Sequence, residues 1–253
     1  MSNGKFNWYD SYVGRENTDP FNIELNQNEK LVFFGDIHEQ LDLFEILLST
    51  INEKYSNIKV VSVGDICDKG PGDNFARELY DKFHSNKNYF LIRGNHESKR
   101  QKYYQKTGHA KYAKILAELP NVLSFVWPTG YRATCIHAGV TPKHGSWNDL
   151  KYNSEILYVR TVDENNEMIP LVWIKKEDGT EELVPKKPNG IIWHHLYDGR
   201  FGYIVSGHDR QKDGVPKFYK NSCNIDTGAY ETGVLTAIVI GKNGIIETIS
   251  KKL

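Results

Sequence analysis

The sequence predicts an α/β fold in which a sandwich of two β-sheets is flanked by helices. Apolar runs of strand length alternate with helical patterns in the N-terminal half, whereas short strands separated by turns dominate from residue 122 onward. Hydrophobic residues make up 39% of the 253-residue chain and charged residues 25%, a composition typical of a globular protein with a packed core.

The N-terminal half predicts a βαβαβ core. Three apolar runs, each followed within two residues by a glycine, predict strands over residues 30–34, 58–63 and 89–92. Two stretches between these runs carry apolar residues at helical spacing, residues 41–51 and 75–83. Strands and helices that alternate at this distance form right-handed crossovers, so we expect a mainly parallel sheet covered by its helices.

The C-terminal half predicts a second sheet of mixed or antiparallel strands. Residues 122–127 and 131–136 are apolar runs joined by Pro128-Thr129-Gly130, a composition typical of a hairpin turn. Four further short apolar runs follow, at residues 203–206, 224–226, 234–240 and 245–249. We expect this second sheet to pack on the first.

The organisation along the chain predicts a single domain over residues 30–253, preceded by an N-terminal extension over residues 1–29. Within the domain, the segment at about 162–190 is rich in charge and proline, and we interpret it as a hairpin insertion. That hairpin, which carries Trp173, would either stay solvated or overhang a functional site as a specificity element.

The charge balance limits the partners of this chain. Lys plus Arg and Asp plus Glu number 32 each, so there is no net positive field to hold a long nucleic acid. No apolar run reaches the roughly 20 residues that span a bilayer, and the first twenty residues lack a signal-peptide core. The three cysteines are far apart. We expect a cytoplasmic protein with reduced thiols that binds neither a membrane nor an extended nucleic acid.

Five of the predicted strands end in polar motifs. The motifs are Gly35-Asp36-Ile37-His38, Gly64-Asp65-Ile66-Cys67-Asp68, Gly94-Asn95-His96-Glu97, His137-Ala138-Gly139 and Gly207-His208-Asp209. Loops beyond the carboxyl ends of strands in an α/β sheet converge on one crevice, so these residues would meet in space. Carboxylate oxygen, amide oxygen and imidazole nitrogen are suitable ligands for divalent transition metals.

The number of ligands suits two metal ions. Asp36 and His38 lie two residues apart in a sharp turn after a strand and would reach one ion. Asp65 has two carboxylate oxygens and would bridge the ions. The coordination of the second ion would be completed by Asn95, His137 and His208. Manganese, iron, zinc and nickel are all suited to this ligand set.

Together, the five motifs resemble the calcineurin-like metallophosphoesterases. Lys69-Gly70, Arg160 in Tyr158-Val159-Arg160, and Ile225-Asp226-Thr227-Gly228 extend the resemblance to the phosphoprotein-phosphatase-like branch. That branch includes the phage lambda-type phosphatases, the diadenosine tetraphosphatases and the phosphatase domain of bacterial polynucleotide kinase-phosphatase. The resemblance covers roughly Leu31 to Ile240, and five ordered motifs are far more specific than any one of them.

The resemblance implies a metal-dependent phosphatase that hydrolyses phosphoester bonds by in-line attack of a metal-bound hydroxide. With this resemblance, manganese is the favoured metal, and iron, zinc, nickel and cobalt are the alternatives. His96 would be the general acid for the leaving oxygen, and Asp68 would orient its ring and favour the protonated form. Lys69, Arg160 and Asn95 would hold phosphate oxygens of the substrate.

Two positions depart from the pattern of the family. Glu39 stands where a glycine usually follows the Asp-x-His triplet, so the loop is bulkier and carries a negative charge. Lys69 stands where arginine is usual, and lysine cannot make the planar two-pronged contact with a phosphate. Both changes leave the metal ligands intact and bear on which substrate is held. Asp226 is a weaker candidate for a position near the metals.

Several functions are consistent with these motifs. The substrate would be a phosphoprotein, as for serine/threonine phosphatases, a nucleotide or an RNA end. An alternative is a bis(5'-nucleosyl)-tetraphosphatase, which cleaves an anhydride. A non-catalytic metal-binding scaffold would have no need for His96 and Asp68, whose joint presence favours an enzyme. The neutral charge balance disfavours a nucleic-acid-binding module.

Other polar residues have simpler interpretations. Arg93 precedes a motif glycine, but a structural role is as consistent with its position as a phosphate contact. His194 and His195, beside Trp193, are expected to pack near the site without binding metal. Three further histidines are interpreted as solvated, namely His84, His109 and His144.

Overall fold

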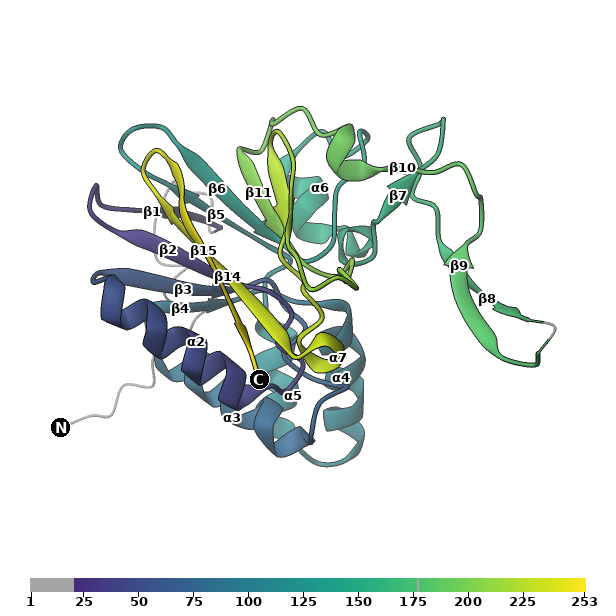
Figure 1. Ribbon diagram of the computed structural model, residues 1–253, viewed down its shortest axis with the longest axis horizontal. Coiled ribbons are helices and arrows are strands. Elements are labelled where there is room, and N and C mark those ends of the chain that lie inside the picture. Colours follow the sequence, from purple (N-terminus) through teal and green to yellow (C-terminus); the bar gives the residue numbers. More distant parts are fainter. Residues whose placement is uncertain (1–20, 177) are drawn as a thin grey trace.

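Two β-sheets lie face to face, with helices covering the outer face of each (Figure 1). The structure is a computed structural model that describes residues 21–176 and 178–253. Aromatic side chains join the sheets: the ring of Phe125 in the second sheet lies 6.0 Å from Phe33 and 5.5 Å from Phe90 in the first, both edge to face. The predicted α/β sandwich of two sheets is therefore confirmed.

The first sheet contains the predicted βαβαβ core. Its strands, in order, are β15 (Gly244–Lys252), β14 (Val234–Gly241), β2 (Lys30–Phe34), β3 (Ile58–Ser62) and β4 (Tyr89–Leu91). Strands β2, β3 and β4 are parallel, whereas β14 and β15 run antiparallel to their neighbours. Helices α2 (Leu41–Lys54) and α3 (Asp73–Ser85) connect the parallel strands and pack on the sheet through their apolar sides.

The second sheet combines parallel and antiparallel pairs. Its strands, in order, are β1 (Asn22–Glu24), β5 (Val122–Val126), β6 (Arg132–Ile136), β11 (Tyr203–Ser206), β13 (Ser222–Asn224) and β12 (Lys217–Phe218). The pair β5 and β6 is the predicted antiparallel hairpin. Strand β13 ends two residues earlier than predicted, which leaves Ile225 and Asp226 in the loop that follows it.

Strand β1 lies inside the segment that the sequence assigns to an N-terminal extension. It pairs in parallel with β5, with Ile23 opposite Phe125, and Leu25 after it is buried in the core. Residues 22–25 therefore belong to the folded domain, and the predicted boundary at residue 30 falls too late. Residues 1–20 of the predicted extension lie outside the described residues.

The segment predicted as an insertion contains two short antiparallel pairs. Strands β7 (Thr161–Val162) and β10 (Ile191–Ile192) pair at its base, and β8 (Leu171–Lys175) and β9 (Glu181–Pro185) pair beyond them. Figure 1 shows that β8 and β9 extend away from both sheets. Trp173 on β8 is 68% exposed.

The remaining helices pack around the two sheets. They are α4 (Asn95–Lys106), α5 (Ala110–Glu118), α6 (Trp147–Tyr152), α7 (Ala229–Thr232) and the 3₁₀ turns η1 (Ser154–Leu157) and η2 (Trp193–His195). A second apolar cluster forms where α6, η1 and η2 pack on the second sheet, around Leu150, Ile156 and Trp193. No helix in the described ranges is long and apolar enough to cross a membrane.

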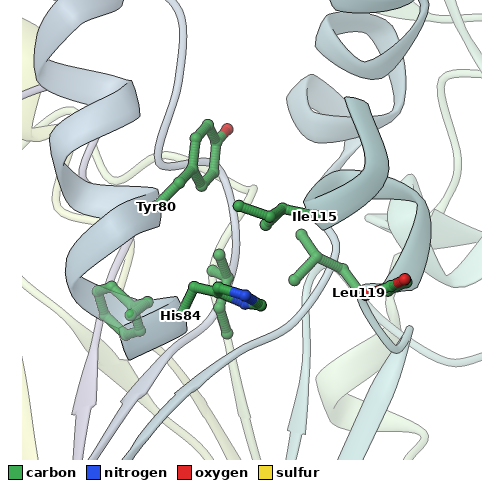
Figure 2. Close-up of a pocket in the computed structure, with 7 residues that line it drawn as sticks. Tyr80, His84, Ile115 and Leu119 are labelled. Atoms are coloured by element: carbon green, nitrogen blue, oxygen red, sulfur yellow. The ribbon is translucent and has the colours of Figure 1, made fainter. Parts of the chain in front are cut away.

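A small pocket lies between α3 and α5. Figure 2 shows Tyr80 and His84 of α3 facing Ile115 and Leu119 across it. Its volume of ≈ 10 Å³ is about the space of a single water molecule, and none of the predicted site residues lines it. The pocket is therefore a packing gap in the helical layer, and the motif residues define a different place in the fold.

Candidate metal centre and active site

The polar motifs follow the carboxyl ends of strands from both sheets. Asp36, Asp65 and Asn95 follow β2, β3 and β4 of the first sheet, and His137 and His208 follow β6 and β11 of the second. All five side chains are buried, with exposed fractions of 8% or less. The two sheets thus bring residues that are far apart in sequence to one place, as the sequence predicts.

Asp65 lies at the centre of this cluster. Its Oδ2 atom is 3.4 Å from Nε2 of His137 and 3.9 Å from Nε2 of both His38 and His96. Two groups of possible metal ligands share this carboxylate, one with His38 and His96 and the other with His137 and His208. This sharing is the geometry expected of a carboxylate between two cations.

The other predicted ligands surround Asp65. Asn95 places Oδ1 2.9 Å from Nε2 of His137 and 2.8 Å from Nδ1 of His208. Asp36 lies outside both histidine groups, and its two oxygens accept hydrogen bonds from the backbone N–H of His208 at 3.2 Å. The structure therefore brings all six predicted metal ligands together and adds His96 to their edge.

Backbone carbonyl groups orient the imidazole rings. Nδ1 of His38 hydrogen-bonds the carbonyl of Cys67 at 2.8 Å, and Nδ1 of His137 hydrogen-bonds that of Val63 at 2.8 Å. A carbonyl oxygen only accepts, so in each ring the bonded Nδ1 carries a hydrogen, and in the neutral ring Nε2 presents a lone pair to the cluster. His208 Nε2 is buried and has no hydrogen-bond partner among the described residues. A bound cation would satisfy such an atom.

The loops that carry these residues have an unusual backbone. Six of the eight described non-glycine residues with positive φ lie in them, namely His38, Glu39, Asp65, Asp68, Lys69 and His208. The left-handed conformation is costly for residues with a Cβ and persists only where the surrounding structure imposes it. Its concentration at these loops is typical of a functional site.

The motif glycines allow the ligand loops to approach one another. A Cβ on Gly94 would lie 2.1 Å from Oδ1 of Asp65, and a Cβ on Gly207 would lie 1.9 Å from Oδ1 of Asp36. No heavy atom can sit at these distances without displacing the carboxylate. Glycine is therefore required before each of these two motif residues, and its role is to position Asp36 and Asp65.

Glu97 positions the Asp65 loop and had no role in the sequence prediction. Its fully buried carboxylate accepts hydrogen bonds from the backbone N–H groups of Asp65, Ile66 and Gly94, each at 2.8 Å, and from the Tyr80 hydroxyl at 3.0 Å. Glu97 belongs to the Gly-Asn-His-Glu motif, and its place in that motif was the one indication in the sequence that it has a role in the site. Its partners lie in two different loops, which the sequence does not reveal.

His96 is linked to a chain of charged residues. Its Nδ1 lies 2.7 Å from Oδ2 of Asp68, as the predicted pairing requires. Arg100, one turn further along α4, hydrogen-bonds the other oxygen of Asp68 and binds Asp73 at 2.7 Å. Burial lowers the pKa of His96 despite the opposing charge of Asp65, whereas the sequence argument expects the protonated form to be favoured. Arg100 was not predicted.

Glu39, the first departure from the family pattern, turns into the protein. Its carboxylate accepts hydrogen bonds from the backbone N–H groups of Asp68 at 2.9 Å and Gly72 at 3.0 Å, and Arg100 lies 3.8 Å away. Only 3% of the residue is exposed. The additional charge is therefore not presented to a substrate, and it holds the loop that carries Asp68 and Lys69.

The two predicted phosphate-binding cations lie at the border of the cluster. Arg160 donates a hydrogen bond to the carbonyl of His208 at 3.1 Å and forms an ion pair with Asp209 at 3.3 Å. Lys69 is exposed, and its Nζ lies 3.4 Å from the hydroxyl of Tyr230. Both side chains retain donors for a bound anion.

The acidic residues of the cluster repel one another. Burial and then the charges of Asp226 and Asp65 raise the pKa of Asp36 well above its usual value. Burial also raises the pKa of Asp226, to about 6. For Asp65, burial is outweighed by His137 and the other imidazoles, which hold its pKa well below the usual range. A buried cluster of carboxylates and imidazoles with an unpaired nitrogen fits divalent metal ions, which add positive charge among the carboxylates.

The contacts of Arg93, His194 and His144 test the roles that the sequence predicted for them. Arg93 donates to the carbonyls of Leu116 and Ala117 at the end of α5, so its role is structural. His194 is buried and stacked on Trp193, as expected of a packing residue. His144 was predicted to be solvated, which is wrong. It is 4% exposed, and its Nδ1 accepts a hydrogen bond from the backbone N–H of Thr141 in its own loop.

Comparison with known sequences matches this chain to a protein family. A sequence model described as calcineurin-like phosphoesterase matches residues 29–212. Bis(5'-nucleosyl)-tetraphosphatase PrpE [asymmetrical] from Bacillus thuringiensis (strain Al Hakam) is 26% identical over 240 residues, which cover 83% of this chain and 89% of that protein. The protein of the same name from Bacillus cereus (strain 03BB102) has the same identity and coverage.

Solved structures share the fold. A crystal structure of a protein assigned as a diadenosine tetraphosphatase has a TM-score of 0.63 and 23% identity, covering 90% of this chain and 97% of that one. A protein serine/threonine phosphatase from Saccharomyces cerevisiae has a TM-score of 0.52 and 15% identity, covering 91% and 82% of the two chains. The matched residues include every predicted metal ligand, and the chain belongs to the calcineurin-like phosphoesterase family.

Proposed function

We propose that this phosphoester hydrolase works with two divalent metal ions held on either side of Asp65. The observation that carries the proposal is the position of Asp65, whose carboxylate is shared by the group with His38 and the group with His137 and His208. Asp36 would complete the coordination of the first ion, and Asn95 would complete that of the second. The unpaired Nε2 of His208 and the mutual repulsion of the buried carboxylates support this assignment.

Manganese is the proposed metal, because the donors are oxygen and nitrogen atoms without a thiolate. Iron, zinc, nickel and cobalt share this preference and are the alternatives to be compared. When bound, the ions would supply a water of lowered pKa and neutralise phosphate oxygens. The protein supplies the remaining requirements, which are a proton for the leaving group and contacts that orient the phosphate.

His96 is the proposed proton donor. Asp68 holds Nδ1 at 2.7 Å, so the other ring nitrogen, Nε2, faces Asp65 at 3.9 Å and would give its proton to the leaving oxygen. Arg100 fixes Asp68 from its other side. Burial lowers the pKa of His96, which makes the protonated ring a stronger acid.

Lys69, Arg160 and Asn95 are the proposed contacts to phosphate oxygens. Asn95 lies within the cluster, whereas Lys69 and Arg160 lie at its border with donors to spare. Charge accumulates on the phosphate oxygens as the bond to the leaving group breaks. The positive charges of Lys69 and Arg160 at this border would stabilise that charge.

A second candidate is hydrolysis of a dinucleoside tetraphosphate, in which the broken bond is an anhydride. The names of the curated relatives, asymmetrical bis(5'-nucleosyl)-tetraphosphatases, favour this substrate class over phosphoproteins and RNA ends. The proposed metals, proton donor and phosphate contacts would serve either bond, because in-line attack on phosphorus is common to both. Product analysis with diadenosine tetraphosphate separates the two candidates.

The test is hydrolysis of p-nitrophenyl phosphate by purified protein with Mn²⁺. We expect turnover by the wild type and a loss of at least about 100-fold in kcat for His96→Ala, with bound manganese retained. His84→Ala on α3, outside the cluster, is the matched control. Absence of turnover with every one of Mn, Ni, Co, Fe and Zn would contradict the proposed function.

A further inference from the structure

Tyr230 lies beside the proposed metal centre. It belongs to the short helix α7, and its ring centroid is 5.0 Å from that of His38, with the two rings edge to face. His38 is a proposed metal ligand, so a group bound next to Tyr230 is a neighbour of the reacting phosphate. None of the sequence motifs included this tyrosine.

Two cations converge on the hydroxyl of Tyr230. Lys69 places Nζ 3.4 Å from the hydroxyl oxygen and 4.8 Å from the ring centroid. Arg210 donates a hydrogen bond from Nη1 to the same oxygen, and its guanidinium carbon lies 5.7 Å from the ring centroid. Because the oxygen accepts from both cations, its own hydrogen is left to be donated elsewhere. The three groups form a set of donors with a net positive charge.

The arginine of this set is fixed in place. A Cβ on Gly228, which has φ of 70°, would lie 2.9 Å from Cγ and Cδ of Arg210, so the arginine stem packs directly on the glycine backbone. Glu231 forms an ion pair with Arg210. Even so, Nε of Arg210 is buried and has no hydrogen-bond partner among the described residues. An oxygen of a bound anion would give this donor a partner.

We propose that Tyr230 and Arg210 bind a second phosphoryl group of the substrate, adjacent to the one that is attacked at the metals and contacted by Lys69. The inference rests on the proposed function and specifies its substrate class as a nucleoside polyphosphate. Consecutive phosphates share a bridging oxygen, so the second anion must lie close to the first. The contact between Tyr230 and His38 meets that requirement.

Base stacking is a less suitable role for Tyr230. Lys69 and Arg210 already lie near its ring, so the ring is not a free platform for a nucleobase. The available chemistry is instead a cluster of N–H and O–H donors, which matches phosphate oxygens. A substrate with a single phosphate would leave the donors of Arg210 and Tyr230 unused.

The test compares diadenosine tetraphosphate with p-nitrophenyl phosphate. For Arg210→Gln we expect the ratio of kcat/KM for the tetraphosphate to that for p-nitrophenyl phosphate to fall about tenfold relative to the wild type. For Tyr230→Phe, which keeps the ring, we expect a fall of about threefold in the same ratio. Tyr152→Phe, at a residue 79% exposed, is the control. Thermal melting verifies that each variant is folded.

In this kinetic comparison, a kcat/KM ratio for Arg210→Gln that stays at the wild-type value would overturn the inference. A loss of kcat/KM of the same size for Arg210→Gln with an acidic phosphoserine peptide as substrate would overturn it too. Binding separates this inference from the proposed function. Calorimetry of the wild type in excess Mn²⁺ should show inorganic tripolyphosphate binding at least about tenfold more tightly than orthophosphate, with the difference reduced in Arg210→Gln. Equal affinities would refute the subsite even if the enzyme hydrolyses p-nitrophenyl phosphate.

Discussion

Replacing Glu97 by glutamine tests whether this buried carboxylate holds the ligand loops. Oε1 accepts hydrogen bonds from the backbone N–H of Ile66 and from the Tyr80 hydroxyl, and Oε2 accepts from the N–H groups of Asp65 and Gly94. Glutamine has the same shape but puts an NH₂ group in place of one oxygen. The less costly orientation directs NH₂ toward Tyr80, because a hydroxyl can accept a hydrogen bond and a backbone N–H cannot.

The expected loss of stability in Glu97→Gln follows from these contacts. One charge-assisted hydrogen bond, to Ile66, is lost at a cost of about 2 kcal/mol. The bonds to Asp65 and Gly94 keep their geometry but lose the charge on the acceptor, at about 0.5–1 kcal/mol each. We therefore expect the free energy of unfolding of Glu97→Gln to be lower by about 3–4 kcal/mol. For a chain of this length that is a fall in Tm of roughly 10 °C.

The assay is urea unfolding of the metal-free protein, with a manganese titration of the folded protein beside it. We expect Glu97→Gln to bind manganese about tenfold more weakly than the wild type, because the Asp65 loop loses part of its support. Glu53→Gln, at an exposed position on α2, is the matched control. A Glu97→Gln protein within about 0.5 kcal/mol of the wild type, with unchanged manganese affinity, would refute the reasoning.

Three further predictions follow from single contacts. Glu39→Ala should lower kcat for p-nitrophenyl phosphate about tenfold, because the N–H groups of Asp68 and Gly72 lose their acceptor; unchanged kcat would contradict this. Burial lowers the pKa of His194 to about 3, so the unfolded chain takes up a proton first as pH falls below about 6.5, and stability declines toward pH 3. His194→Phe should flatten that decline in urea unfolding, and an equal slope would count against it. Arg93→Gln should lower the free energy of unfolding by about 1–2 kcal/mol, with kcat unchanged; a large loss of kcat would show that Arg93 acts in the site.

The strands and helices of the first sheet could be predicted because their apolar pattern is local. Strand β2 has the predicted bounds, residues 30–34, since a continuous buried run ends directly at a glycine. Strand β1 could not be predicted, because its three residues, Asn22 to Glu24, show no apolar pattern and gain their structure by pairing with β5. Short edge strands of this kind depend on the neighbour that the fold supplies.

The gathering of the motif residues in one place could be predicted because each of them follows a strand end in a recognisable motif. The residues that position them were less accessible to sequence reasoning. Glu97 hydrogen-bonds the loop of Asp65 and Ile66, which lies about 30 residues earlier in the chain, and Tyr230 contacts Lys69 across a separation of 161 residues. Glu39 stood out as a departure, yet its inward orientation depends on N–H groups of a distant loop. Hydrogen bonds between distant loops leave no periodic pattern in a sequence.

The central claim is that Asp65 lies between two divalent cations. The most direct measurement is an anomalous difference map from crystals of the full chain grown with Mn²⁺. We predict two peaks on either side of the Asp65 carboxylate, one bonded to His38 and the other to His137 and His208. A single peak, or two peaks that do not share Asp65, would contradict the assignment.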